Sequence, residues 1–453
     1  MKKIRVSAII SIGVALLFSA SCKKTFYTSA NVNPNAPTSV TPATLLSTIE
    51  GSLAYTQGGD MSRFASLFMQ QTNGISRQSS AYYTYIFTGQ DVDGLWGNLY
   101  TSVMENDLQL MMASDAKGYN VYSGVSRVIM AYTLQLTVDN WGSIPYSKAF
   151  GGLTNLQPAY DQDQALYGVA LSLCDSAIYY LNLPKAGFLT PGGEDMIYGG
   201  NAAAWAKFAH AIKARLYIHQ SKGAPANATL ALAEIAQSFS ASSDNAIYNG
   251  FGANSNANNP WYQFNNQRGD ISFASATMGA GMLANADPRY NILIDTTAAD
   301  GGDYLGGYYG GAPNAPVELI TYEELQFMAA EATMVVNGAG ALASAQTYYQ
   351  TGISASMTKL GVAAADMTTY LAAHGTLTTA NAMSNIVWEE YVANYLNPEA
   401  WTTWRRTGYP TLTPTGTTNT PRRLLYPQSE YSYNKANTPA GSTMLTPRIF
   451  WDK

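Results

Sequence analysis

Charged residues are scarce in this sequence, and their scarcity excludes several classes of protein. They make up 12% of the 453 residues, against roughly a quarter in typical soluble domains. The formal net charge is −5, and the chain has no cluster of lysine and arginine of the kind that nucleic-acid binding needs. Tyrosine, with 32 residues, and many Asn, Thr, Ser and Gly residues take the place of charge. Such a composition suits a neutral polar ligand better than an ionic one.

Cysteine is almost absent as well. The chain has only Cys22 and Cys174, so no disulfide framework supports it and its stability must come from a packed core. Cys174 lies in a helical apolar pattern at residues 171–178. We expect it to be a small buried hydrophobic residue rather than a reactive thiol.

Long apolar runs are missing except near the first residue. Residues 2–5 carry three cations, residues 6–18 are mostly apolar, and residues 19–21 are small. This order is typical of a signal peptide, and the run is shorter than the roughly 20 apolar residues that a membrane-spanning helix needs. We therefore expect residues 1–21 to be a cleaved signal peptide.

Cys22 directly follows these small residues, as in the lipobox of bacterial lipoproteins, where the cysteine becomes acylated. Ser19 stands where that motif usually has Leu. We expect Cys22 to be lipidated and residues 22–41, which contain the turn-rich run NPNAP, to be a tether. The alternative is an ordinary secretory signal followed by a chance cysteine.

Signatures of metal binding and of nucleophilic catalysis are missing. His210, His219 and His374 do not have metal-ligand spacing, and no nucleophile elbow or phosphate loop occurs. His219 lies on an apolar stripe, so we expect it to be a hydrogen-bonded core residue. No catalytic residue, no metal and no cofactor are predicted.

The acidic residues leave two alternatives to that prediction. Glycoside hydrolysis needs two opposed carboxylates, and Asp91 and Asp93 are the most visible pair, although loop acids capping a helix explain them better. A calcium ion could be held by Asp295, Asp300 and Asp303, but their spacing is not that of a helix–loop–helix calcium site.

Helical periodicity is the main signal that the sequence does contain. Apolar residues recur at spacings of three and four in three segments, residues 95–112, 121–136 and 205–219. The third segment follows Asn201, a candidate N-cap. Lys213, Arg215 and Lys222 lie near its C-terminal end, where the helix dipole favours cations. The folded part should begin with a helix at Pro42.

Residues 321–360 predict two helices joined by a short glycine-containing loop. Thr321 and Glu324 match a capping box at the start of residues 325–336, and residues 342–360 repeat the helical pattern. A helix pair of this length looks like a tetratricopeptide-type unit. The expected fold class is mainly α, with such helix pairs stacked on one another.

Residues 240–316 differ from the rest of the chain. Residues 254–259 are nearly all Asn, and residues 301–311 alternate Gly with Tyr and Asp. Irregular runs of this length are usually functional loops. We expect a single helical domain over residues 42–453 with this loop-rich insertion, which contains a helix near residues 273–284.

Three clusters contain aromatic rings, which stack on sugar faces, and the first two also contain amides that pair with hydroxyl groups. The first runs from Tyr82 to Asn98, the second from Trp261 to Arg268, and the third from Tyr304 to Tyr309. The ligand-binding candidates are Tyr83, Trp96, Asn98, Trp261, Tyr262, Asn265 and Tyr308. The alternative is that these rings only pack the loops onto the scaffold.

Seven blocks carry a family resemblance. They are residues 33–42 (NPNAPTSVTP), 139–146 (DNWGSIPY), 198–209 (YGGNAAAWAKFA) with 213–216 (KARL), 287–289 (DPR), 324–331 (ELQFMAAE), 399–410 (EAWTTWRRTGYP) and 421–427 (PRRLLYP). In this order they resemble the SusD/RagB family, and its SusD-like branch from Bacteroidetes in particular, over nearly the whole mature chain. Physically most of these residues should be structural: Trp401 and Trp404 face one way, and Arg405 and Arg406 can fork to carboxylates or carbonyls.

The resemblance implies a SusD-like fold and a place in nutrient uptake. Such a protein is anchored by lipid in the outer membrane, facing the cell surface, and works with a SusC/RagA-type, TonB-dependent barrel. It captures a ligand, commonly an oligosaccharide and in some members a peptide, and passes it on without cleaving it. One departure concerns Lys23 and Lys24, which stand where related bacteria often have acidic residues that signal surface export.

Four functions therefore remain open at this point. The first is glycan capture for the barrel, and the second is capture of peptide or another nutrient by the same machinery. The third is a helical enzyme that cleaves its glycan, and the fourth is a lipoprotein scaffold that docks other proteins. Aromatic and amide side chains serve both glycans and peptides, so the sequence does not separate the first two.

Overall fold

The structure is a computed structural model, and it describes residues 40–184, 187–299 and 301–453. The predicted signal peptide, Cys22, the predicted tether up to residue 39 and Asp300 lie outside the described residues. The chain divides into two units, Met1–Thr41 and Pro42–Lys453, and the following description concerns the second.

Helices dominate the second unit, as the periodicity predicted. The longer helices are α3 (Pro42–Thr56), α7 (Glu105–Lys117), α8 (Asn120–Trp141), α9 (Asp163–Asn182), α10 (Ala202–Gln220), α11 (Ala226–Ile235), α15 (Tyr322–Asn337), α16 (Leu342–Lys359), α17 (Ala364–His374), α18 (Ala382–Ala393) and α19 (Glu399–Thr407). The first begins at Pro42, as expected. None of the described helices is long and apolar enough to cross a membrane.

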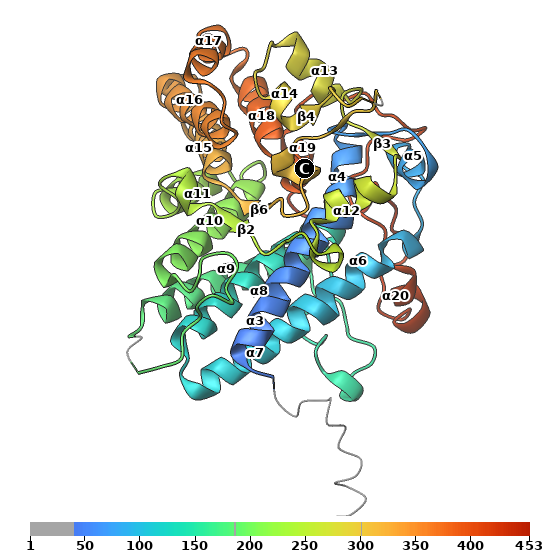
Figure 1. Ribbon diagram of the computed structural model, residues 1–453. Helices are drawn as coiled ribbons and strands as arrows, with labels where there is room; N and C mark the ends of the chain where they lie inside the picture. The colour runs from blue at the N-terminus through green and yellow to red at the C-terminus, as the bar shows by residue number, and fades with distance from the viewer. Residues whose placement is uncertain (1–39, 185–186, 300) are drawn as a thin grey trace, which may run out of the picture. The chain divides into compact units, whose positions relative to one another are not determined.

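Consecutive helices pack in pairs, α8 with α9, α10 with α11 and α15 with α16. Neighbouring pairs touch through α9 with α10 and through α11 with α15, and Figure 1 shows α9, α10, α11, α15 and α16 following one another up one side of the unit. This arrangement confirms the predicted stack of tetratricopeptide-like helix pairs. Each pair buries on its neighbour a face that it could not bury alone.

Helix α8 lies at the centre of the packing. Every residue from Val121 to Trp141 except Arg127 is buried, so the helix is covered on all sides rather than along one stripe. Its polar side chains are mostly bonded inside the core: the Thr133 and Thr137 hydroxyl groups donate to carbonyl oxygens one turn earlier. Cys174 of α9 is fully buried, as predicted, and burial raises the pKa of its thiol.

Shorter elements fill the rest of the unit. Between α3 and α7 lie the π-helix η1 (Gln57–Met61), α4 (Ser62–Phe68), α5 (Arg77–Tyr83), η2 (Gly89–Val92), α6 (Asp93–Gly97) and the π-helix η3 (Asn98–Met104). The helix predicted over residues 95–112 is therefore α6, η3 and α7 in succession. Helix η4 (Gly152–Thr154) lies in the connection between α8 and α9, η8 (Gly338–Ala341) joins α15 to α16, and α20 (Gln428–Tyr433) lies in the segment that follows α19.

The loop-rich insertion is more ordered than the sequence indicated. It contains η5 (Ser242–Asp244), β2 (Ala246–Tyr248), η6 (Ser255–Ala257), α12 (Pro260–Gln267), β3 (Ile271–Ser272), α13 (Thr277–Ala284), α14 (Tyr290–Leu293), β4 (Ile294–Asp295), β5 (Tyr304–Leu305) and the π-helix η7 (Gly307–Gly311). Helix α13 is the one expected near residues 273–284. Strand β2 pairs antiparallel with β6 (Val317–Ile320) and closes the base of the insertion, whereas β3 pairs with β1 (Asn73–Gly74) and β4 with β5.

A buried ion pair joins the helix pairs to each other. Arg215 of α10 donates from Nε and Nη2 to the two carboxylate oxygens of Glu324 of α15, at 2.8 and 2.7 Å, and both side chains are fully buried. Arg215 lies before the last turn of α10, whose basic residue is His219, so the expected role of Arg215 at the helix dipole is wrong. The predicted capping box is half formed: the Thr321 hydroxyl accepts from the Glu324 N–H, but the Glu324 carboxylate is held by Arg215.

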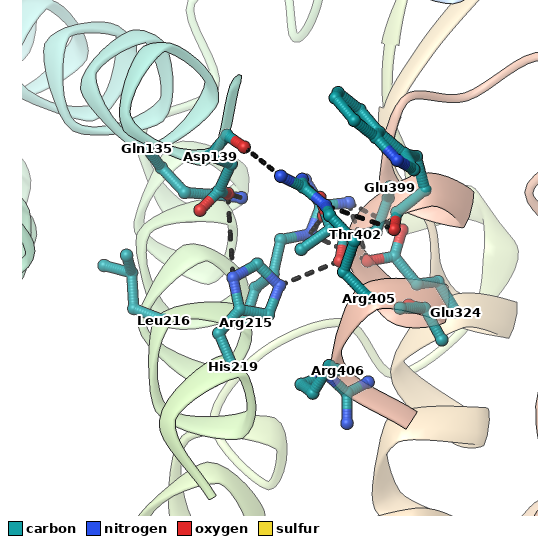
Figure 2. A network of polar contacts seen from close by, with 12 residues as sticks. Gln135, Asp139, Arg215, Leu216, His219, Glu324, Glu399, Thr402, Arg405 and Arg406 are labelled. Atoms are coloured by element: carbon teal, nitrogen blue, oxygen red, sulfur yellow. Dashed lines mark hydrogen bonds and ion pairs between the residues drawn. The ribbon is translucent and has the colours of Figure 1, made fainter. Parts of the chain in front are cut away.

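His219 extends this network toward α8 and α19 (Figure 2). Its Nε2 lies 2.8 Å from Oε1 of Glu399, and its Nδ1 lies 2.9 Å from the Tyr167 hydroxyl, which in turn donates to Asp139. Burial lowers the pKa of His219 to about 3, so the ring is neutral. The expectation of a hydrogen-bonded core histidine is confirmed.

The C-terminal residues close the core around the same network. Trp451 donates from Nε1 to Oδ1 of Asp139 at 3.0 Å. Trp401 is buried and donates to the Pro421 carbonyl, while Arg406 pairs with Glu331. Arg405 donates to the carbonyl oxygens of Asp139 and Arg422. These contacts confirm the structural roles expected for Trp401, Arg405 and Arg406.

Candidate ligand-binding site

Two neighbouring hollows that share Tyr55 form the candidate site, which we call the Tyr55 groove. The first hollow has a volume of about 460 Å³ and lies between α3, η3 and the loop that follows β2. The second has about 200 Å³ and lies between η1, α4, α5 and α12. Tyr55 stands between them with 46% of its surface exposed, so its ring is open to a ligand that spans both hollows.

A π-helix contributes to each hollow. Helix η3 contributes Asn98 and Ser102 to the first hollow, and η1, which follows α3 directly after Thr56, contributes Asp60 to the second. A π-turn carries an extra residue in the helix and often lies at a functional site. The interruption of α6–α7 by η3 thus coincides with the point where the helix contributes polar side chains to the groove.

The lining of the first hollow contains no charged side chain. Its aromatic residues are Tyr55, Tyr248 and Phe251, and its amides include Asn98 and Asn256. Tyr248 and Phe251 meet edge to face with ring centroids 4.9 Å apart. Rings and neutral amides together can bind the C–H faces and hydroxyl groups of a sugar without any ionic contact.

A glycine allows Tyr248 to approach α3. A Cβ atom at Gly51 would lie 3.2 Å from the Tyr248 hydroxyl oxygen, closer than carbon and oxygen normally pack. Behind the ring, Glu50 is buried, and burial together with the charge of Asp195 raises its pKa well above the usual range. Glu50 is not among the residues that line this hollow.

The Asn-rich loop is held in place by its own side chains. Asn258 donates from Nδ2 to the carbonyl oxygens of Gly252 and Asn254, at 2.8 and 3.0 Å. Gln263 of α12 donates to the Ser255 carbonyl and accepts from the Tyr55 hydroxyl. The loop and Tyr55 are therefore positioned before any ligand binds, which lowers the entropy cost of binding.

The second hollow contains charges that are already compensated. The Arg63 guanidinium lies 4.5 Å from the centroid of the Phe264 ring and pairs with Asp60. Arg268 lies 5.5 Å from the same centroid and pairs with Asp270 at 2.5 Å. These contacts fix the Phe264 ring and leave little net charge for recognising an ionic ligand.

Of the predicted ligand-binding residues, the structure brings Asn98 into the groove. Tyr82 and Arg268, which belong to the first two predicted clusters, line the second hollow. Trp96 and Trp261 are 6% and 2% exposed. Both rings are packed inside the protein, and Trp261 donates from Nε1 to the Ser62 hydroxyl at 2.8 Å.

The other predicted residues lie outside the two hollows and are half-buried. Tyr83 packs against the core, and Tyr262 donates its backbone N–H to the Asn259 side chain. Asn265 lies on the same helix, α12. Tyr308 donates its hydroxyl to Glu318 at 2.7 Å, next to Lys359. Tyr308 and Tyr309 of the third aromatic cluster thus belong to a polar contact with Glu318 rather than to the groove.

Sequence reasoning missed Tyr55, Tyr248, Phe251 and Phe264. The signal for Tyr55 was its place on α3 away from the buried positions Leu46, Ile49 and Leu53, since an aromatic ring on the exposed face of a helix has no packing role. The Asn-rich run at residues 254–259 was noticed, but its pairing with α3 is a tertiary contact that periodicity does not reveal.

Four of the acidic residues that could have indicated catalysis or calcium, Asp91, Asp93, Asp295 and Asp303, accept hydrogen bonds within the protein, and Asp300 lies outside the described residues. Asp91 accepts from the Thr88 N–H in a capping box on η2, and Asp93 accepts from the Ser429 N–H. Asp295 accepts from Thr297, and Asp303 accepts from the N–H groups of residues 273 and 274.

Asp139, His219 and Glu399 are close enough to hold a metal ion within the described part of the chain. All three are buried, and the His219 nitrogens already face Glu399 and Tyr167. The guanidinium groups of Arg215 and Arg405 contribute positive charge at the same place. A cation would be repelled there, so we assign no metal to this network.

Comparison with known proteins gives one family match. Residues 34–427 match the SusD-like family model described as "Starch-binding associating with outer membrane". No curated protein matches the chain.

Several solved structures have the same fold. A chitin-binding protein is 22% identical, with a TM-score of 0.78 over 91% of this chain and 100% of its own. A SusD/RagB family protein from Bacteroides thetaiotaomicron is 23% identical, with a TM-score of 0.76 over 91% and 99%. A chitin-binding SusD homolog from Flavobacterium johnsoniae is 22% identical, with a TM-score of 0.74 over 89% and 98%.

Proposed function

The chain belongs to the SusD-like family of proteins associated with the outer membrane, and on this premise we propose that it captures a neutral oligosaccharide in the Tyr55 groove. The observation that carries the proposal is the first hollow, which combines three aromatic rings with side-chain amides and has no charged residue in its lining. A sugar without ionic groups fits this chemistry, because its C–H faces stack on rings and its hydroxyl groups pair with amides.

The proposal includes capture without cleavage. No carboxylate of a described residue lines the first hollow, and Glu50, which directly precedes the lining residue Gly51, is buried and held by the Met196 N–H and Asp195. Hydrolysis would need a second, opposed carboxylate with access to the sugar. In the proposed role the ligand passes unchanged to a SusC/RagA-type, TonB-dependent barrel in the outer membrane, where lipid on Cys22 keeps the protein.

The test is calorimetric binding of maltooligosaccharides and chitooligosaccharides to the mature chain in detergent. At least one neutral oligosaccharide should bind, and Tyr55→Ala should weaken its binding about fivefold, because the loss of one stacked ring is worth on the order of 1 kcal/mol. The control is Tyr179→Ala, since Tyr179 is an exposed ring on α9 that does not line the groove. Binding of peptides and of no glycan would overturn the proposal in favour of peptide capture.

The partner is tested separately. A tagged chain isolated from native outer membranes should bring a TonB-dependent barrel with it. Isolation with other proteins, and without a barrel, would favour a scaffold role.

A further inference from the structure

A second large cavity lies apart from the Tyr55 groove. It has a volume of about 650 Å³, lies between the segment that follows α8 and the C-terminal segment, and shares no lining residue with the groove. Its walls include the rings of Tyr160, Tyr426 and Phe450, and its cations are Arg423 and Arg448. We call it the Arg423 pocket.

Arg423 is a buried cation whose bonds all go to neutral groups. Only 1% of its surface is exposed. Its hydrogen bonds with described residues are donated to the carbonyl oxygens of Leu424, Pro447 and Trp141. A guanidinium has five N–H donors, so donors remain beyond these three bonds. The preceding residue, Arg422, is different, since it pairs with Asp452.

Arg448 adds a second cation at a more open position. Its side chain is 51% exposed, and its nearest carboxylate, that of Asp452, lies 3.8 Å away and is already held by Arg422. The carboxylate in the lining is that of Asp163. Its Oδ2 accepts from the Phe450 N–H at 2.9 Å. The lining therefore has two cations and one carboxylate that is engaged with the backbone.

The walls have the chemistry of a sugar site. Tyr160 and Tyr426 meet edge to face with centroids 5.4 Å apart, and the Arg423 guanidinium lies 4.5 Å from the Tyr426 centroid. The Tyr160 hydroxyl donates to Glu430, a carboxylate that lies outside the lining. Gln162 and Asn437 supply amides at the pocket. Aromatic walls, amides and a guanidinium are together suited to a sugar that carries a carboxylate.

We propose that the Arg423 pocket is a second ligand site, which takes a carboxylate-bearing sugar such as a uronic acid residue, whereas the Tyr55 groove takes neutral sugars. This inference rests on the proposed glycan-capture function. An anion bound between Arg423 and Arg448 would compensate a buried charge that has only neutral partners in the protein, and charge-assisted hydrogen bonds to carboxylates are among the strong ones.

The experiment is calorimetric titration of the mature chain in detergent with trigalacturonic acid at low salt. Arg448→Gln should weaken binding at least about fivefold, as expected for loss of one charge-assisted contact. Ala436→Trp, at an exposed position in the lining, should block the pocket and abolish binding without touching the core. The matched control is Lys435→Gln, which removes a neighbouring exposed cation that does not line the pocket and should leave the affinity unchanged.

The outcomes separate this proposal from the first one. Neutral oligosaccharides should bind Arg448→Gln as they bind the wild type. The second site is refuted and glycan capture stands in either of two cases. In the first, neutral oligosaccharides bind but trigalacturonic acid does not; in the second, the affinity for trigalacturonic acid is unchanged by Arg448→Gln and by Ala436→Trp. If the tripeptide Ala-Ala-Ala binds as tightly as trigalacturonic acid, the pocket recognises a carboxylate alone and the assignment to a sugar acid fails.

Discussion

At the scale of single residues, burial decides what a given side chain can do. Trp96 and Trp261 have the larger rings, yet both are buried, whereas Tyr55 is 46% exposed between two hollows. An aromatic residue contributes to ligand binding only through a face that the protein leaves open. A prediction of ligand-binding residues from residue type alone therefore favoured the tryptophans over Tyr55, which lines the groove.

His219 gives a pH-dependent prediction at this scale. Its pKa is about 3 in the folded protein because of burial, against an ordinary value of 6.5. Between these values the unfolded chain binds a proton that the folded chain does not, so this residue's contribution to stability falls as the pH drops below about 6.5. Relative to His219→Gln, the wild type should lose on the order of 1.4 kcal/mol of unfolding free energy per pH unit between pH 6 and pH 4.

The measurement is urea unfolding of both proteins across that pH range. Other buried groups shift in the opposite direction, for example Glu324, whose pKa burial raises to about 7. Taking the difference between wild type and variant removes the contributions of groups that do not contact His219. Parallel curves for the two proteins would contradict a neutral, buried His219.

At the scale of helices and strands, the periodic patterns predicted most of the scaffold. The pair formed by α15 and α16, the cap of α10 by Asn201 and the start of α3 at Pro42 are all observed. These features depend on local spacing and capping chemistry, which the sequence contains. The ion pair between Arg215 and Glu324 was not predicted, because it joins residues that are 109 positions apart.

Removal of that ion pair should weaken the contact between α10 and α15. We expect Arg215→Met to lower the unfolding free energy by about 3–5 kcal/mol, because Glu324 and Glu399 would remain buried without their cation. The matched control on the same helix is Lys207→Met, which breaks a partly exposed pair with Asp244 and should cost less than about 1 kcal/mol. Thermal unfolding followed by circular dichroism compares the two, and equal losses would contradict the special role of the buried pair.

At the scale of the whole molecule, the predicted lipid anchor determines at which membrane the groove binds its ligand. The lipid on Cys22 stays a prediction from the sequence, since this residue lies outside the described part of the chain. Wild-type protein should incorporate labelled palmitate and fractionate with the outer membrane. Cys22→Ser should remain unlabelled and move to the soluble fraction. If wild type and Cys22→Ser fractionate alike, the alternative of an ordinary secretory signal holds.

The sequence by itself determined the fold class, the helix pairs, the buried roles of Cys174 and His219 and the family, because these follow from local periodicity, composition and short blocks of residues. Only the tertiary structure decided which rings face solvent. The Tyr55 groove joins α3, η3 and the loop that follows β2, and the Arg423 pocket joins residues near 142–163 to residues 423–450. The physical reason is that a binding site forms where exposed faces of segments far apart in the sequence come together. Both the exposure of a side chain and the proximity of distant segments depend on tertiary packing rather than on local sequence.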